Sequence, residues 1–352
     1  MEFIKPGINI DFVGKRKAAF VISALLIVIT CLLLIWREGP NYGVDFTGGV
    51  LIQVKLDQAR TPAEIRAALE SVQLQDSIIQ EFGEQGKFEY LIRVRKTEIE
   101  LSGLSNRVKQ ALILDLGQGV EIRRVEMVGP KVGEDLRQKA LFAIFYAILF
   151  IAVYISGRFE LKWLMSMIMG LSLAFVVYIS SSFNMSVTWL IVVAMIVTIG
   201  LCWVLNLKYA LGAIIALIHD VTITVGAFAL TDREISLSII AAFLTIVGYS
   251  LNDTIIVFDR IRENLGRFRK KPFAEVLNRS INETLSRTVL TSTTTLVVIL
   301  ALFFLGGGVI HDFAFAILIG ILVGTYSSVF VASPILMIWE GDFAGKTRLV
   351  KK

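Results

Sequence analysis

Residues 210–230 read ALGAIIALIHDVTITVGAFAL, an apolar run with a histidine and an aspartate near its centre. A helix of about 20 apolar residues is long enough to cross the hydrocarbon core of a bilayer, which is about 30 Å thick. Comparable runs recur along the chain, and 55% of its 352 residues are hydrophobic. The other runs are 18–36, 139–156, 163–182, 187–206, 236–258, 288–306 and 312–339. The pattern excludes a soluble enzyme, a disordered chain and a secreted disulfide scaffold, and it predicts a polytopic α-helical membrane protein.

The pair of runs 163–182 and 187–206 is the least regular part of this pattern, because only four residues separate its members. One interpretation is a single re-entrant hairpin. Two full crossings fit the lengths better and give eight spans in all.

The distribution of lysine and arginine predicts which side of the membrane each segment faces. Lys15, Arg16 and Lys17 stand directly before the first run, eight basic residues lie between 259 and 287, and four lie in the tail. The short loops 231–235 and 306–311 together contain a single lysine or arginine, Arg233. Cytoplasmic loops are enriched in Lys and Arg, so both termini and the loop between 259 and 287 are expected in the cytoplasm. The excess positive charge is therefore interpreted as topological, and no nucleic-acid partner is expected.

These assignments divide the chain into four parts. Residues 1–36 form the cytoplasmic N-terminus and first transmembrane helix, and 37–138 form an extracytoplasmic (periplasmic) α+β domain. Residues 139–339 form a transmembrane bundle of about seven further helices, including the extra pair near 163–206. Residues 340–352 form a cytoplasmic tail.

The extracytoplasmic segment has its own alternation of strands and helices. Strands are predicted at 50–56, 77–82, 88–94 and 120–127, and helices at 61–71 and 104–116. Thr61-Pro62-Ala63-Glu64 has the residues of a capping box with proline in the first helical turn. The order β-α-β-β-α-β is typical of the ferredoxin-like fold.

Enzymatic, metal and cofactor chemistry is not expected. The chain holds two cysteines, Cys31 and Cys202, and two histidines, His219 and His311. They are too few and too scattered for a disulfide framework or for a zinc or heme centre. The sequence also lacks the His-Glu-x-x-His and Gly-x-Gly-Asp motifs of membrane proteases.

Three charged residues within or beside the apolar runs need an explanation, because a charge at the centre of a span costs about 2.5–3.5 kcal/mol. Asp253 is interpreted as a proton or ion site, with a structural carboxylate as the alternative, and Asp220 fits either role. Arg287 is either a cytoplasmic anchor or the start of a hydroxyl-lined helical face, with Thr291 and Thr294, that extends into the bundle.

Two glycine-bearing motifs predict close packing and turns. Gly320, Gly324 and Ser328 place small residues one helical turn apart, which allows two helices to approach closely. The segment Gly43-Val44-Asp45-Phe46-Thr47-Gly48-Gly49 is expected to form a turn, since paired glycines supply positive φ as the chain leaves the membrane. This segment and residues 129–133 are the candidate hinges of the extracytoplasmic domain.

Five motifs together carry a resemblance to a known family. They are the Gly43–Gly49 segment, ALIHD at 216–220, GYSLNDT at 248–254, VFDRIREN at 257–264 and LSRTVLTS at 285–292. In this order the chain resembles the SecD/SecF family of protein-export membrane proteins, specifically its SecF-type members, over nearly its whole length.

The resemblance implies half of a permease bundle of the resistance-nodulation-division type, with SecD as the other half. It implies an accessory subunit that uses the proton-motive force to promote late steps of preprotein translocation across the bacterial inner membrane. The implied partners are SecD, SecYEG with SecA, YajC, translocating preproteins and membrane lipid. The proton pathway is expected at Asp253, Arg287, Asp220, Asn252 and Thr254. A signature and hinge role is expected for Gly43, Asp45, Phe46, Thr47, Gly48 and Gly49.

The chain departs from the six spans of SecF-type proteins. About 47 extra residues, Leu161 to Leu207, add two apolar segments, and an even number of crossings preserves the orientation of everything downstream. No charged residue lies between Trp163 and Asn206, so the pair is expected to serve packing or partner contact. The alternative function is half of a proton-driven small-molecule exporter of the same superfamily.

Overall fold

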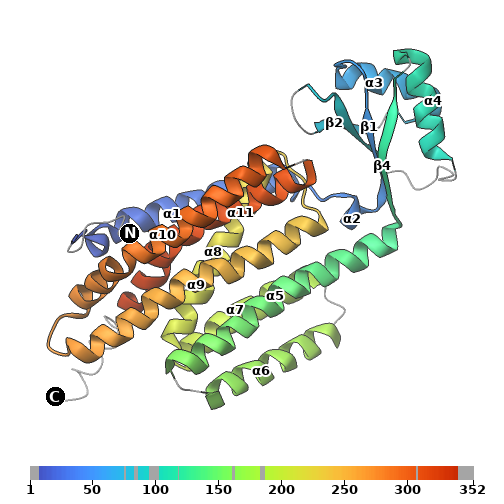
Figure 1. Ribbon diagram of the computed structural model, residues 1–352. Coiled ribbons are helices and arrows are strands. Elements are labelled where there is room, and N and C mark those ends of the chain that lie inside the picture. Colours follow the sequence, from blue (N-terminus) through green and yellow to red (C-terminus); the bar gives the residue numbers. More distant parts are fainter. Residues whose placement is uncertain are drawn as a thin grey trace.

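The computed structural model describes residues 8–74, 77–82, 86–94, 103–117, 119–160, 163–182, 187–306 and 308–339. Figure 1 shows an elongated helical bundle with a small sheet domain at one end and the α9–α10 turn at the opposite end. The bundle helices are α1 (Phe12–Trp36), α5 (Pro130–Glu160), α6 (Trp163–Ser182), α7 (Val187–Val204), α8 (Lys208–Leu230), α9 (Leu237–Arg267), α10 (Phe273–Leu305) and α11 (Gly308–Ser327).

The helical membrane architecture is confirmed. Among the described residues, six helices are long and apolar enough to cross a membrane: α1, α5, α8, α9, α10 and the helix Ile310–Trp339. That last helix is α11 continued through a π-helical turn at Ser328–Ala332. The six correspond to six of the eight predicted spans.

The extra apolar pair forms α6 and α7, helices of 20 and 18 residues. One face of α7 is buried through residues four positions apart: Leu190, Ala194, Thr198 and Cys202. In Figure 1, α6 lies at the outer side of the bundle next to α5 and α7. Whether each helix of the pair crosses the membrane stays a prediction.

The basic segment 259–287 was predicted as a loop, but most of it is helical. α9 continues to Arg267 and α10 already begins at Phe273. The buried residues Ile261, Leu277 and Ile281 continue the helical spacing of the apolar runs. The two helices therefore keep packing against each other beyond the apolar segments.

The predicted ferredoxin-like domain is confirmed. Its elements are β1 (Gly49–Lys55), α3 (Pro62–Ala68), a 3-10 turn (Glu70–Val72), β2 (Ile78–Phe82), β3 (Glu89–Val94), α4 (Leu104–Leu116) and β4 (Glu121–Val128). The sheet order is β2-β3-β1-β4 with antiparallel neighbours throughout. Alternate residues of β1, Val50, Ile52 and Val54, are buried in the core of the domain. The capping box at Thr61 and Glu64 is formed at the start of α3.

The sheet domain joins the bundle through two adjacent connections. β1 follows directly after the short helix α2 (Val44–Thr47), and α5 begins at Pro130, directly after β4. β1 and β4 are paired at this end, with Gly49 opposite Val128. Both connections therefore leave the same end of one two-stranded ribbon.

Candidate intramembrane proton site

Asp253 is buried between three helices. It lies on α9 and is 1% exposed. The Ser292 hydroxyl of α10 donates to Asp253 Oδ2 across 3.4 Å, and Ser292 Oγ lies 2.7 Å from the Thr325 hydroxyl of α11. An isolated charge in apolar surroundings is strongly disfavoured, so a buried carboxyl must be neutral or have partners. A hydroxyl can donate to a carboxylate or accept from a carboxylic acid, which suits a group that gains and loses a proton.

Asp220 is the second buried carboxyl group, and both of its oxygens have partners. Asp220 Oδ1 lies 2.8 Å from His219 Nδ1. Asp220 Oδ2 accepts from Ser250 Oγ of α9 at 2.5 Å and from Ser327 Oγ of α11 at 2.8 Å. A contact of 2.8 Å between an imidazole nitrogen and a carboxyl oxygen requires a proton on one of the two atoms. The arrangement thus can hold one proton in an apolar site.

The network around Asp220 extends to α1. His219 Nε2 lies 3.0 Å from Ser23 Oγ, which in turn lies 3.2 Å from the Tyr326 hydroxyl. Tyr326 donates to the carbonyl oxygen of Ala19 at 2.8 Å, and its ring stacks on His219. His219 is therefore a satisfied polar residue that connects α8 with α1 and the Ile310–Trp339 helix.

Residues close together on α9 and α11 connect the surroundings of the two carboxyl groups. Ser250, which bonds to Asp220, lies one turn before Asp253 on α9. Thr325 belongs to the Asp253 group and Ser327 to the Asp220 group, two residues apart on α11. A sliding or rotation of α11 would change the Ser327–Asp220 bond and the Thr325–Ser292 contact together.

Small residues set the distance between α9 and α11. A Cβ atom at Gly324 would lie 2.9 Å from Ser250 Cβ, and one at Gly320 would lie 2.3 Å from Ile246 Cγ1. Both distances are below van der Waals contact, so the helix spacing depends on glycine at these positions. Ser328 is fully buried and donates to the carbonyl oxygen of Thr325 at 3.0 Å.

Asn252, Thr254 and Arg287 do not join the buried group around Asp253. Asn252 is exposed, and Thr254 is buried but donates to the carbonyl oxygen of Ser250 on its own helix. Arg287 is exposed as well, although it is close enough to attract Asp253 electrostatically.

The expectation that the Arg287 face extends into the bundle is wrong for this chain. Thr294 is exposed, and the Thr291 and Thr294 hydroxyls donate to carbonyl oxygens of α10 itself. Helical spacing groups Arg287, Thr291 and Thr294 on one face but does not say which way that face points.

The signature segment at residues 43–49 is packed against the bundle. Its central residues form α2, where Asp45 Oδ2 accepts from the backbone N–H of Leu237 at 2.8 Å and Phe46 is 4% exposed. Gly48 has φ +71°, and a Cβ atom there would lie 2.7 Å from Pro130 Cα. Only glycine satisfies both the positive φ and the close approach to the start of α5.

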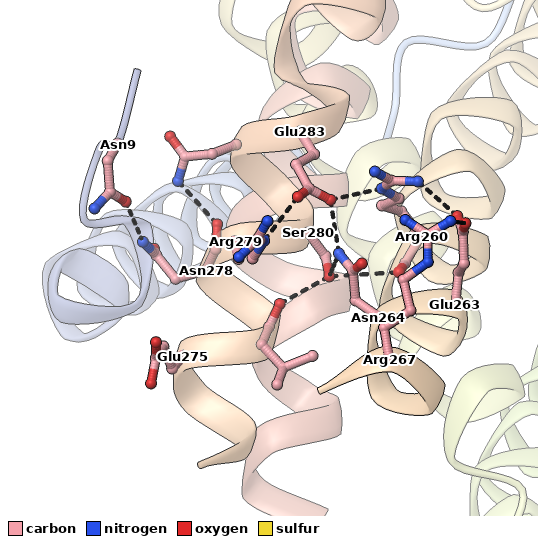
Figure 2. A network of polar contacts seen from close by, with 12 residues as sticks. Asn9, Arg260, Glu263, Asn264, Arg267, Glu275, Asn278, Arg279, Ser280 and Glu283 are labelled. Carbon is pink, nitrogen blue, oxygen red and sulfur yellow. Dashed lines mark hydrogen bonds and ion pairs between the residues drawn. The ribbon is translucent and has the colours of Figure 1, made fainter. Parts of the chain in front are cut away.

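A polar network joins the extensions of α9 and α10 beyond the apolar runs, as Figure 2 shows. Asn264 is fully buried and donates to Ser280 Oγ at 3.0 Å and to Glu283 Oε2 at 2.7 Å. Arg260 and Arg279 both donate to Glu283, at 2.6 and 2.8 Å. Arg260 and Asn264 of the motif VFDRIREN therefore belong to the contact surface of this helical hairpin.

The hydroxyl residues that surround the two carboxyl groups were not among the predicted site residues. These are Ser250 on α9, Ser292 on α10, and Thr325 and Ser327 on α11. Helical spacing offered one signal, since Ser250 precedes Asp253 by three residues and so lies near it on the helix surface. Contacts between helices distant in sequence gave no such signal.

Comparisons with known proteins agree with this architecture. Residues 108–202 and 178–342 match the family "Protein export membrane protein SecD/SecF, C-terminal", and residues 34–59 match the "SecD/SecF GG Motif". The chain is 40% identical over 349 residues to protein translocase subunit SecF of Magnetococcus marinus, covering 97% of this chain and 95% of that protein. It is 39% identical over 338 residues to the SecF subunit of Vibrio alginolyticus, covering 96% and 91%.

Among solved structures, the chain is similar to SecDF, a translocon-associated membrane protein from Thermus thermophilus. The TM-score is 0.70 at 32% identity, and the match covers 95% of this chain and 39% of that one. A second SecDF structure, in the super-membrane-facing form, matches with a TM-score of 0.58 at 30% identity over 99% of this chain and 41% of that one. This chain thus spans less than half the length of the SecDF chains.

Proposed function

Because the chain belongs to the SecD/SecF family of protein-export membrane proteins, we propose that it is an accessory subunit of a Sec protein translocase. In this role it works with a SecD-type partner and uses the proton-motive force to promote late steps of preprotein translocation. The wider assembly would include the SecYEG channel with SecA, YajC, the translocating preprotein and surrounding lipid. The membrane is the bacterial inner membrane, with both termini in the cytoplasm and the sheet domain outside.

The observation that supports the proton-driven part is the burial of Asp253 on α9 next to hydroxyl groups of α10 and α11. In a membrane span, an ionisable residue in the bundle interior is by default a candidate for an ion or proton pathway. In the proposed mechanism Asp253 takes up a proton from one side and releases it to the other. Arg287 cannot lose its proton, so it supplies a fixed positive charge near the ionised carboxylate.

A SecD-type partner is supported by polar side chains on the outer surface of α9 and α10. Asn252 and Arg287 are exposed on this chain although they lie within or next to apolar runs. Contact of such side chains with lipid tails is unfavourable, and a second half-bundle would cover them. Covering Arg287 would also place it in a medium of lower dielectric, where its attraction to Asp253 is stronger.

The energy available from protons fits a two-state motor. One elementary charge that crosses a potential of 100 mV releases about 2.3 kcal/mol. Shifting a two-state equilibrium from 1:99 to 99:1 takes about 5.5 kcal/mol. Two protons release about 4.6 kcal/mol at 100 mV, so one or two protons at membrane potentials of this order supply most of the energy that such a switch takes.

Export assays in membranes depleted of this chain test the proposal. Reloading the wild-type chain should restore the part of preprotein export that a protonophore abolishes, and the chain should co-purify with a SecD-type subunit. Proton-dependent efflux of small molecules, with preprotein export unchanged by depletion, would contradict the proposal. That result would favour the small-molecule exporter.

A further inference from the structure

The first turn of α9 is capped by Asp45, a residue far from it in the sequence. Ser236 precedes the helix and has the residue type of an N-cap, but its hydroxyl makes no capping bond and lies 2.8 Å from Ser238 Oγ. The N–H of Leu237 instead donates to Asp45 Oδ2, 192 residues earlier in the chain, at 2.8 Å. A carboxylate at a helix N-terminus is favoured both by this hydrogen bond and by the helix dipole.

Backbone contacts fix the same two segments to each other. The N–H of Gly43 donates to the carbonyl oxygen of Ile235 at 2.9 Å, and the N–H of Ile235 donates to that of Asn41 at 2.8 Å. Phe46 belongs to the same buried apolar cluster as Ile239 and Phe243 of α9. The segment before β1 and the start of α9 thus form one packed unit.

The sheet domain is connected to this unit on two sides. α2 ends at Thr47, and β1 begins two residues later at Gly49. From β3, Arg93 forms an ion pair with Glu234, which lies three residues before the first residue of α9. Movement of the sheet relative to the start of α9 would break the Arg93–Glu234 pair, the Asp45–Leu237 bond, or both.

We propose that Asp45 is a positioning residue that links the sheet domain to α9, the helix that carries Asp253. Its carboxylate holds the first turn of α9 to α2, the short helix directly before β1. A shift of α9 on proton binding would therefore displace the sheet domain as well. The inference rests on the proposed function, because it requires that Asp253 binds the driving proton. In this proposal Asp45 transmits movement from α9 to the sheet domain and takes no part in proton transfer.

Three variants of the full chain, assembled with its partner subunit, test the link. Asp45→Ala should lower the gradient-dependent export rate about fivefold, which corresponds to about 1 kcal/mol and to the typical loss of an N-cap. Asp45→Asn keeps a carbonyl oxygen for the Leu237 N–H and should retain most of the rate. Ser236→Ala is the matched control and should export at the wild-type rate, because its hydroxyl is not the cap.

A distance measurement separates transmission from a simple loss of stability. Spin labels are placed at Leu114→Cys on α4 and Leu305→Cys at the end of α10, both 82% exposed, in a chain whose Cys31 and Cys202 are replaced by alanine. In reconstituted vesicles, a proton gradient should change the label distance in the wild-type background and in Asp45→Asn. The change should be clearly smaller in Asp45→Ala and absent in Asp253→Asn.

The outcomes for the link and for the proposed function are distinguishable. A distance change that Asp253→Asn abolishes but Asp45→Ala preserves would overturn the link and leave the proton site standing. Equal export losses in Ser236→Ala and Asp45→Ala would also overturn it. Gradient-dependent export that survives in Asp253→Asn would instead contradict the proposed function.

Discussion

The Ser250 hydroxyl and the Asp220 carboxyl group join α9 to α8 through a hydrogen bond of 2.5 Å. Ser250 is fully buried, and Asp253 lies one turn further along the same helix. The helix that presents the candidate proton carrier is therefore fixed to the neighbouring helix by a second carboxyl group. This arrangement gives Asp220 a definite structural contact whether or not it also exchanges a proton.

Ser250→Ala should destabilise the bundle by about 1.5–3 kcal/mol, the range for a hydrogen bond to a charged group. The substitution leaves Asp220 Oδ2 with Ser327 as its remaining described partner. Thermal unfolding of the purified complex in detergent measures the effect. Thr245→Ala is the control on the same helix, because the Thr245 hydroxyl is exposed and bonds only to its own backbone; a similar loss in both variants would contradict the assignment.

Gly324→Ala should destabilise the packing of α9 against α11 by about 1–3 kcal/mol, the usual cost of overpacking. Its Cβ atom would lie 2.9 Å from Ser250 Cβ and would push the serine that bonds to Asp220. Gly200→Ala on α7 is the control, since no described atom lies within 4 Å of its Cβ position. An unfolding midpoint lowered by Gly324→Ala and unchanged by Gly200→Ala is expected; the reverse order would refute the packing role.

Asn264→Ala should loosen the hairpin formed by the ends of α9 and α10. The variant loses two hydrogen bonds from a fully buried side chain, at a cost of about 1–3 kcal/mol. Faster tryptic cleavage in the 268–272 turn, which contains Arg269, Lys270 and Lys271, is the expected result. Arg267→Ala, which removes only an exposed pair with Glu263, should cleave at nearly the wild-type rate there, since such pairs contribute about 0–1 kcal/mol.

Arg287→Lys distinguishes a counter-charge from a cytoplasmic anchor. Lysine keeps the positive charge but lacks the planar guanidinium, so it is a poor substitute where a carboxylate is held in a fixed geometry. Gradient-dependent export by the assembled complex should fall in this variant while membrane insertion stays normal. Export equal to that of the arginine form would show that Arg287 only anchors α10 at the membrane surface.

Local sequence patterns were sufficient to predict the main elements of the fold. Alternation in 50–56 and the capping box at Thr61 predicted the ferredoxin-like domain, because both depend on neighbours in sequence. The apolar runs predicted six of the long helices for the same reason. The extension of α9 to Arg267 was missed because hydropathy falls at the membrane surface, whereas the buried spacing of Ile261 continues.

The candidate site was predictable only in part. The cost of a charge in a span singled out Asp253 and Asp220, and the structure places both in buried polar groups. The partners of these carboxyl groups come from other helices, as Ser292 and Ser327 do, and a serine in a span carries no signal of its own. The Asp45–Leu237 contact joins residues 192 positions apart, so no local pattern could reveal it.

Asp253 is proposed to carry the proton that drives export, and a single substitution at this residue is the sharpest test of that role. Asp253→Asn keeps the size and the hydrogen bond from Ser292 but cannot bind and release a proton at physiological pH. In inverted membrane vesicles that hold the assembled complex, preprotein export is measured with and without an imposed proton gradient. The Asp253→Asn chain should be present at the wild-type level, bind its partner, and export at one rate in both conditions. If a gradient accelerates export by this variant as much as by the wild type, Asp253 does not carry the driving proton.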